Sequence, residues 1–179
     1  MAKSDQFFIR GKVTTNGTTY AQAEIDLGSF VNLGVSKSTL LRIHRVDVQY
    51  MDNSAKMTPI FYDGAVSGNQ TKWQLTTQTQ SGIVDFTDKS LAASGALSCY
   101  PISPGFSGGL TSQGPLEETV DLNPSGFGMG YLVGVDTLFI GADNYAAWDT
   151  GDIDVCVLLS CSLESATQAN SVALALSQQ

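Results

Sequence analysis

A serine within a glycine-rich run is the first feature of the sequence that could do chemistry. Ser107 lies between Gly105 and Gly109 in GFSGG, which fits the G-x-S-x-G elbow, a strained strand-to-helix turn that exposes a nucleophilic serine. Pro104 precedes this run and Leu-Thr-Ser-Gln-Gly-Pro follows it, so the sequence predicts no helix there. The only histidine, His44, lies upstream of the serine, whereas the elbow needs one downstream. We therefore interpret the run as a glycine-rich turn.

The chain also contains a histidine, an aspartate and a serine in the chain order of a chymotrypsin-like protease. This order is His44, then one of Asp47, Asp63 or Asp85, then Ser107, and GFSGG resembles the serine motif of that family with Phe where Asp is usual. Against this hypothesis, the histidine lies in a predicted strand between two arginines, and nothing around it resembles the family's Ala-Ala-His segment. The sequence therefore predicts that the chain is not an enzyme and assigns no catalytic residue.

Carboxylates gather in the segment ADNYAAWDTGDID. Asp149, Asp152 and Asp154 surround a turn, and strand alternation places the last two on one face. Oxygen ligands at this density could bind Ca²⁺, but the spacing does not fit the D-x-D-x-D-G loop. Our preferred interpretation is a solvated turn without a metal, and a structural Ca²⁺ site at these three residues is the alternative. The sequence contains no phosphate-binding loop and no zinc spacing, so no other cofactor is predicted.

Three cysteines, Cys99, Cys156 and Cys161, cannot all pair within one molecule. The last two are five residues apart, so on one strand they point to opposite faces and cannot form a disulfide. We interpret all three as small buried residues in a reducing compartment.

The elements that hold these residues are predicted from short segments in which apolar and polar residues alternate, which is typical of strands. Asn16-Gly17 predicts a hairpin turn between the first two strands, and a change of apolar parity near His44-Arg45 predicts a β-bulge. The predicted strands are Phe7–Val13, Tyr20–Leu27, Thr39–Met51, Met57–Tyr62, Thr71–Gln80, Ile83–Thr87, Leu97–Ile102, Glu117–Leu122, Tyr131–Ile140 and Ile153–Leu163.

The last of these strands has an unbroken apolar row, as expected for a strand at the centre of a sheet. The row contains Val155, Val157, Leu159, Cys161 and Leu163, and the predicted core includes the first three of these together with Ile43. Trp73 and Leu75 share one face of their predicted strand. After residue 163 the chain is rich in helix formers, and one helical stripe could contain Ala166, Ala169, Val172, Ala173 and Leu176.

Many short strands without crossover helices indicate an all-β protein, an antiparallel β-sandwich of the jelly-roll or immunoglobulin-like kind. We predict one sandwich domain over residues 1–163 and a short C-terminal helix or tail over residues 164–179. The segment Pro101–Gly130 is rich in Gly and Pro, which predicts loops with contact or closure functions.

The charge of the chain is divided along its length. The net charge is −8, yet all nine Lys and Arg residues precede residue 90, and the nine acidic residues after it have no basic neighbour in sequence. The sequence has no basic arm, so direct nucleic-acid binding is disfavoured. It also shows no signal-peptide pattern, and its longest apolar stretch is about half of what a bilayer needs. We expect the acidic half, including Asp149–Asp154, and the tail after Glu164 to take part in contacts between subunits.

Four segments, FFIRGKV, LLRIHRVDVQY, WDTGDIDV and VALALSQQ, resemble pieces of virion proteins from small tailless icosahedral viruses, whose capsomers are made of single jelly-roll subunits. The resemblance implies a capsid subunit that self-assembles into an icosahedral shell after synthesis in the cytoplasm of a microbial host. Its expected partners are copies of itself and other virion proteins, in several such viruses around an inner membrane. No catalytic residue is implied.

Two other classes of protein stay open at this point. One is another assembling protein, such as a fibre or spike, and the other is a carbohydrate-binding β-sandwich module. A chain with 15% charged residues has neutral surfaces that are desolvated at low cost, which favours assembly. A carbohydrate-binding module is expected to stay monomeric or form small oligomers and to expose aromatic rings in a groove.

Overall fold

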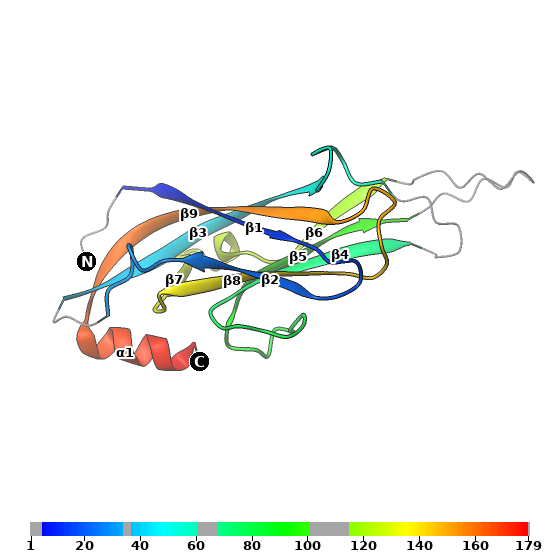
Figure 1. The fold of residues 1–179 in the computed structure, drawn as a ribbon. Coiled ribbons are helices and arrows are strands. Elements are labelled where there is room, and N and C mark those ends of the chain that lie inside the picture. Colours follow the sequence, from blue (N-terminus) through cyan, green and yellow to red (C-terminus); the bar gives the residue numbers. More distant parts are fainter. Residues whose placement is uncertain (1–4, 34–36, 61–67, 101–114, 179) are drawn as a thin grey trace, which may run out of the picture.

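The computed structural model describes residues 5–33, 37–60, 68–100 and 115–178, and shows two packed antiparallel sheets with a C-terminal helix (Figure 1). Ser107, Asp63 and residues 101–114 of the predicted loop Pro101–Gly130 lie outside the described residues. The elements are β1 (Phe7–Thr14), β2 (Ala21–Asp26), β3 (Lys37–Asp52), β4 (Asn69–Thr76), β5 (Leu91–Cys99), β6 (Leu116–Leu122), the 3₁₀ helix η1 (Pro124–Phe127), β7 (Tyr131–Val133), β8 (Thr137–Asn144), β9 (Ile153–Thr167) and α1 (Gln168–Ser177).

The strand order defines a jelly roll. The first sheet has the order β1-β9-β3-β7 and the second sheet the order β2-β8-β4-β5-β6. With β6 set aside, the first strand pairs with the last, the second with the seventh, the third with the sixth and the fourth with the fifth. This is the pairing of one long hairpin wound into two sheets, so the predicted single jelly roll is confirmed and the immunoglobulin-like alternative is wrong.

The predicted turn at Asn16-Gly17 forms, but it does not join paired strands. The Thr19 amide donates to the Asn16 carbonyl at 3.0 Å, and Gly17 has the positive φ of 57° that favours glycine. However, β1 pairs with β9 and β2 pairs with β8, so this turn carries the chain from one sheet to the other. A turn motif describes local backbone geometry and does not select the partner of either strand.

The predicted bulge in the long third strand is confirmed. In β3, Ile43 lies opposite Cys161 and Arg45 lies opposite Ser160, which leaves His44 as the extra residue. Because the bulge reverses the side-chain alternation, the odd-numbered Ile43 and the even-numbered Val46 are both buried in the core.

Some predicted strands are wrong. Residues 83–87 form a loop over β4, where the Gln74 side chain donates to the Gly82 carbonyl at 2.9 Å and accepts from the Val84 amide at 2.7 Å. The predicted strand Tyr131–Ile140 divides into β7 and β8, which belong to different sheets. Residues 57–60 form no strand, and β5 begins at Leu91, six residues before the predicted Leu97.

The core lies between the two sheets where the apolar rows predicted it. Val155, Val157, Leu159 and Ile43 are each at most 3% exposed, and Trp73 and Leu75 of β4 face them from the second sheet. Cys99 and Cys161 are buried as predicted, whereas Cys156 on the opposite face of β9 is half-buried.

The last strand, predicted to end at Leu163, continues as β9 to Thr167 beside the first residues of β3. Helix α1 then packs on its own subunit through Ser171 and Gln178. The Gln178 amide donates to the Leu132 carbonyl at 2.6 Å and accepts from the Gly134 amide at 2.9 Å. No helix in the described part of the chain is long and apolar enough to cross a membrane.

The helical stripe predicted from the sequence forms on α1, apart from Ala166, which lies in β9. Val172 and Leu176 are 46% and 65% exposed, so the stripe that contains them faces away from the sandwich. Hydrogen bonds of the polar residues Ser171 and Gln178 orient the helix instead.

Candidate functional site

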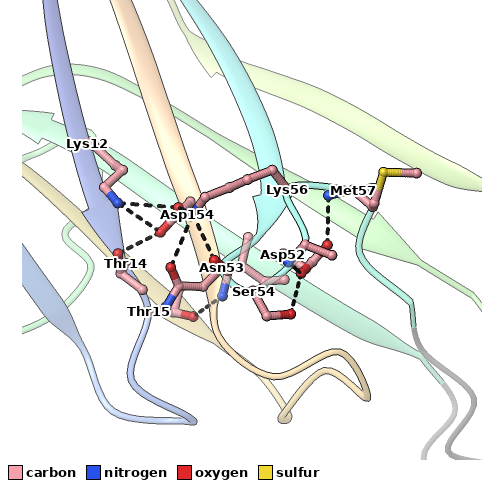
Figure 2. Close-up of polar contacts among 11 residues, drawn as sticks. Lys12, Thr14, Thr15, Asp52, Asn53, Ser54, Lys56, Met57 and Asp154 are labelled. Carbon is pink, nitrogen blue, oxygen red and sulfur yellow. Dashed lines mark hydrogen bonds and ion pairs between the residues drawn. The ribbon is translucent and has the colours of Figure 1, made fainter.

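A cluster of charged side chains closes one end of the first sheet (Figure 2). At its centre is Asp154 of β9, whose side chain is 1% exposed. Lys56 Nζ donates to its carboxylate at 2.5 Å, Lys12 Nζ at 3.3 Å and Thr14 Oγ1 at 2.6 Å. Both lysine side chains are about half exposed, at 51% for Lys12 and 50% for Lys56, so the cluster presents cationic groups to solvent over a buried carboxylate.

Sheet register and one tight turn bring these residues together. Thr14 of β1 lies opposite Asp154, which places Lys12 two residues away on the same face. Lys56 comes from the turn after β3 and has a φ of 59°, which is uncommon for a residue other than glycine. The Asp52 carboxylate holds that turn, because it accepts from the Ala55 amide at 2.6 Å and the Met57 amide at 2.7 Å.

The two aspartates of the cluster are both held in their charged form. Burial by itself raises the pKa of Asp154, but hydrogen bonds from Lys56, Thr14 and Lys12 outweigh this effect, and its pKa lies below the ordinary value. The pKa of Asp52 is lowered by hydrogen bonds from the Ala55 amide and other donors of the turn. The cluster therefore keeps fixed charges at neutral pH.

The three candidate calcium ligands are not brought together. The carboxylate of Asp154 is bound by two lysines and a threonine, while Asp152 Oδ1 accepts from the Gly17 amide at 2.8 Å. The described residues contain no group of three or more His, Cys, Asp or Glu side chains that could hold a metal ion. This geometry does not fit a Ca²⁺ site at Asp149, Asp152 and Asp154, because lysine ammonium groups take the place that a cation would need.

Of the residues considered for hydrolysis, the structure describes His44, Asp47 and Asp85, and each of them bonds to other partners. His44 Nε2 lies 2.8 Å from Ser162 Oγ, and no acid among the described residues bonds to its ring. Asp47 accepts from Arg45 Nε at 2.7 Å, and Asp85 accepts from the Thr87 amide at 2.8 Å. A serine nucleophile needs a base that a third group orients. Among the described residues, no carboxylate orients the His44 ring that contacts Ser162.

A second ion pair crosses the first sheet. Arg42 of β3 donates from Nε to Glu164 at 2.6 Å and from its second terminal nitrogen at 2.8 Å, and both side chains are less than 10% exposed. Its remaining nitrogen donates to the Met129 carbonyl at 2.6 Å. Such a bidentate pair satisfies both charges within the subunit.

These two clusters show where charges from the basic first half and the acidic second half of the sequence meet in the fold. The basic residues of the first half neutralise Asp154 and Glu164 of the second half inside one molecule. The expectation that the whole turn Asp149–Asp154 faces a neighbouring subunit is therefore wrong for Asp154. Sequence reasoning did not identify Lys12, Lys56 or Arg42 as partners, because each lies about 100 or more residues from its acid and only strand pairing joins them.

Apart from these ionic contacts, the described surface exposes several large apolar side chains, some of them in pairs. Phe127 and Met129 precede β7, and Val172 and Leu176 lie on α1. Tyr100 and Tyr145, 58% and 72% exposed, flank a hollow of about 200 Å³ at one end of the second sheet. Pairs of this kind are typical of contact surfaces.

No family model matches the chain, and no curated protein matches it. Similar solved structures include VP1 of Trichodysplasia spinulosa-associated polyomavirus in complex with GM1 oligosaccharide, which is 14% identical over 89% of this chain and 93% of that chain, with a TM-score of 0.41. VP1 of Merkel cell polyomavirus in complex with disialyllactose is 11% identical over 89% of this chain and 94% of that chain, with a TM-score of 0.39. A Merkel cell polyomavirus virus-like particle is 12% identical over 85% of this chain and 62% of that chain, with a TM-score of 0.35. These values are too low to transfer a function.

Proposed function

We propose that this chain is a structural virion protein, a capsid subunit that self-assembles into an icosahedral shell. The main support for the proposal is the jelly-roll topology, in which β1 pairs with β9, β2 with β8, β3 with β7 and β4 with β5. Jelly rolls made of two sheets form viral capsid and lectin domains, so this fold favours a small number of functional classes. The four segments that resemble virion proteins favour the capsid class among these.

The surface of the described residues supports assembly. Exposed apolar pairs, such as Phe127 with Met129 and Val172 with Leu176, lie on loops and on the helix, outside the core of the sandwich. Burying them against a neighbouring subunit removes apolar area from water, which favours association.

The proposal assigns the chain a structural role and no catalysis. His44 contacts a buried serine and lacks an orienting acid among the described residues, and Asp154 is neutralised by lysines. We further propose that the chain resides in the virion, is made in the host cytoplasm, and contacts copies of itself and other virion proteins near an inner membrane. Direct nucleic-acid binding is not part of the proposal, because Lys12, Arg42 and Lys56 are paired with carboxylates of the same chain.

Particle formation by the purified chain tests this function. We expect negative-stain microscopy and sedimentation velocity to show large symmetric particles that form above a threshold concentration. A chain that stays monomeric at all concentrations and salt conditions would contradict the capsid function. Particles without icosahedral symmetry, such as filaments, would favour the fibre or spike alternative.

One specific observation favours a second candidate function, carbohydrate binding. The hollow between Tyr100 and Tyr145 is also lined by Asn69, Gln70 and Ser98, so aromatic rings stand beside amide and hydroxyl groups. The Gln70 amide donates to Ser98 Oγ at 3.0 Å, which holds this polar floor in place. Rings that stack on a sugar and polar groups that bind its hydroxyls are the usual parts of a sugar site.

Saccharide binding to the purified chain distinguishes the two functions. Saturation-transfer NMR with a panel of oligosaccharides is expected to show contacts between a saccharide and the protein that disappear in Tyr145→Ala. The same contacts are expected to persist in Tyr131→Phe, the control, because Tyr131 does not line this hollow. No signal with any saccharide would remove this second candidate and leave the capsid proposal unaffected.

A further inference from the structure

The outer face of the first sheet has a hollow along β9. Its volume is about 550 Å³, and strand register places Arg10 and Lys12 of β1 on one side and Asp47 and Gln49 of β3 on the other. Leu158 and Cys156, both half-buried residues of β9, form its floor. The hollow thus combines an apolar floor with charged walls.

This face is cationic although the chain has a net charge of −8. Its cations are Arg10, Lys12, Arg45 and Lys56, against the three carboxylates of Asp47, Asp52 and Asp154. The Arg10 side chain is exposed and forms no ion pair or hydrogen bond with another described residue. The excess of positive charge attracts an acidic partner.

The opposite charge is concentrated at the far edge of the second sheet. Strand β6 is the last strand of that sheet, and its exposed side chains include Glu117, Glu118 and Asp121. No cation among the described residues pairs with any of them. Val120 is exposed beside them at 54%, so the edge presents an apolar side chain together with its charges.

From this complementarity we infer that the hollow on β9 receives the β6 edge of a second copy of this chain. Glu118, on the same face of β6 as Val120, then faces Arg10 and Lys12, and Val120 covers the apolar floor. The inference rests on the proposed function, because it names the contact through which subunits join.

The geometry of such a contact is head-to-tail. The two surfaces lie on different sheets of one subunit, so each copy offers its hollow to one neighbour and its β6 edge to another. A contact of this kind builds a ring when its rotation closes, and a ring is a unit from which a closed shell can be made. Acidic side chains on a sheet edge can have another role, which is to prevent pairing with a strand of another chain. Reversing their charge keeps the edge charged, so it separates this role from docking.

Charge reversal on each surface tests the inference. In Arg10→Glu, and in Glu118→Lys, we expect the concentration needed for assembly to rise by about tenfold or more, because attraction becomes repulsion. A chain that combines both substitutions is expected to recover assembly, since the two charges are exchanged. Lys37→Glu and Glu24→Lys, which change exposed residues elsewhere, are the matched controls. Melting temperatures show that each variant is folded.

Alkylation of Cys156 provides a second readout in the unmodified chain. The thiol lies on the floor of the hollow, so we expect its reaction with a maleimide to be about tenfold slower in particles than in subunits dissociated by high salt. Reversal variants that assemble as the wild type does, or equal labelling in both states, would overturn the inference while leaving the capsid function standing. A wild-type chain that never assembles would overturn both.

Discussion

At the scale of single residues, the Asp154 carboxylate of β9 connects its own strand with β1 and with the turn after β3. It is buried, yet its partners Lys12 and Lys56 reach it from half-exposed positions, so their amines remain partly hydrated. A charge-assisted hydrogen bond to a buried acceptor contributes more than an exposed ion pair, because water competes less well for it. The pair of Arg45 and Asp47, 64% and 40% exposed, is the contrasting case on the same sheet.

We predict that Asp154→Asn lowers the free energy of unfolding by about 1–3 kcal/mol at pH 7. The folded-state pKa of Asp154 is lowered, so its contribution is fully present above the unfolded pKa of about 4 and is lost as the pH falls through the folded pKa. Urea unfolding of both proteins from pH 7 to pH 2.5 measures this difference. It is expected to shrink below about pH 4, and Asp47→Asn is expected to change little. Equal stability of wild type and Asp154→Asn at pH 7 would contradict the role assigned to this residue.

At the scale of elements, β9 decides the structure of the first sheet. It pairs with β1 on one side and β3 on the other, and its two faces differ in burial. Val157 points into the core and is 3% exposed, while the next residue, Leu158, lies on the floor of the outer hollow. Neighbouring residues on one strand therefore have opposite structural roles.

We predict that Val157→Asp prevents folding, because an unpaired carboxylate in the core costs several kcal/mol of a marginal stability. The control is Leu158→Asp on the opposite face, which is expected to fold with a smaller loss of stability. Circular dichroism and thermal unfolding of the soluble fractions measure both. Should Val157→Asp melt at the wild-type temperature, the assignment of this face to the core would be wrong.

At the scale of the whole molecule, the two ends of the chain complete one sheet. β1 lies beside β9 along its full length (Figure 1), from Phe7 opposite Cys161 to Thr14 opposite Asp154. Ile9 and Val13 of β1 belong to the core, whereas α1 contributes no residue to it and contacts the sandwich through Ser171, Leu174 and the following Gln178. The first strand is therefore part of the core, and the final helix is an addition to it.

We predict opposite results for two truncations. A chain that begins at Thr15 is expected to remain unfolded, since it exposes the edge of β9 and loses two core side chains. A chain that ends at Thr167 is expected to keep the fold and melt a few degrees lower, because it loses the hydrogen bonds of Gln178 and Ser171. Circular dichroism of both proteins is the measurement. A folded chain without β1 would show that β9 does not need this partner.

Local patterns in the sequence determined most of the strands. Alternation of apolar residues located β1, β6 and the core row of β9, since an exposed strand face and a buried one need different side chains. The parity change near His44 identified the bulge, because a bulge is the device that restores a buried face within one strand. These signals depend on neighbours in sequence, so they needed no knowledge of partners.

Only the tertiary structure decided which strands pair and which charges meet. The turn at Gly17 has hairpin geometry, yet β1 joins β9, because burial of apolar rows selects a partner across the whole chain. Lys12 and Asp154 are 142 residues apart in sequence and carry no motif, so neither their contact nor the loss of the candidate calcium site could be predicted. The orientation of the helical stripe, away from the sandwich, has a similar cause, since Gln178 finds its hydrogen-bond partners on β7 and the loop after it only once the sheets have formed.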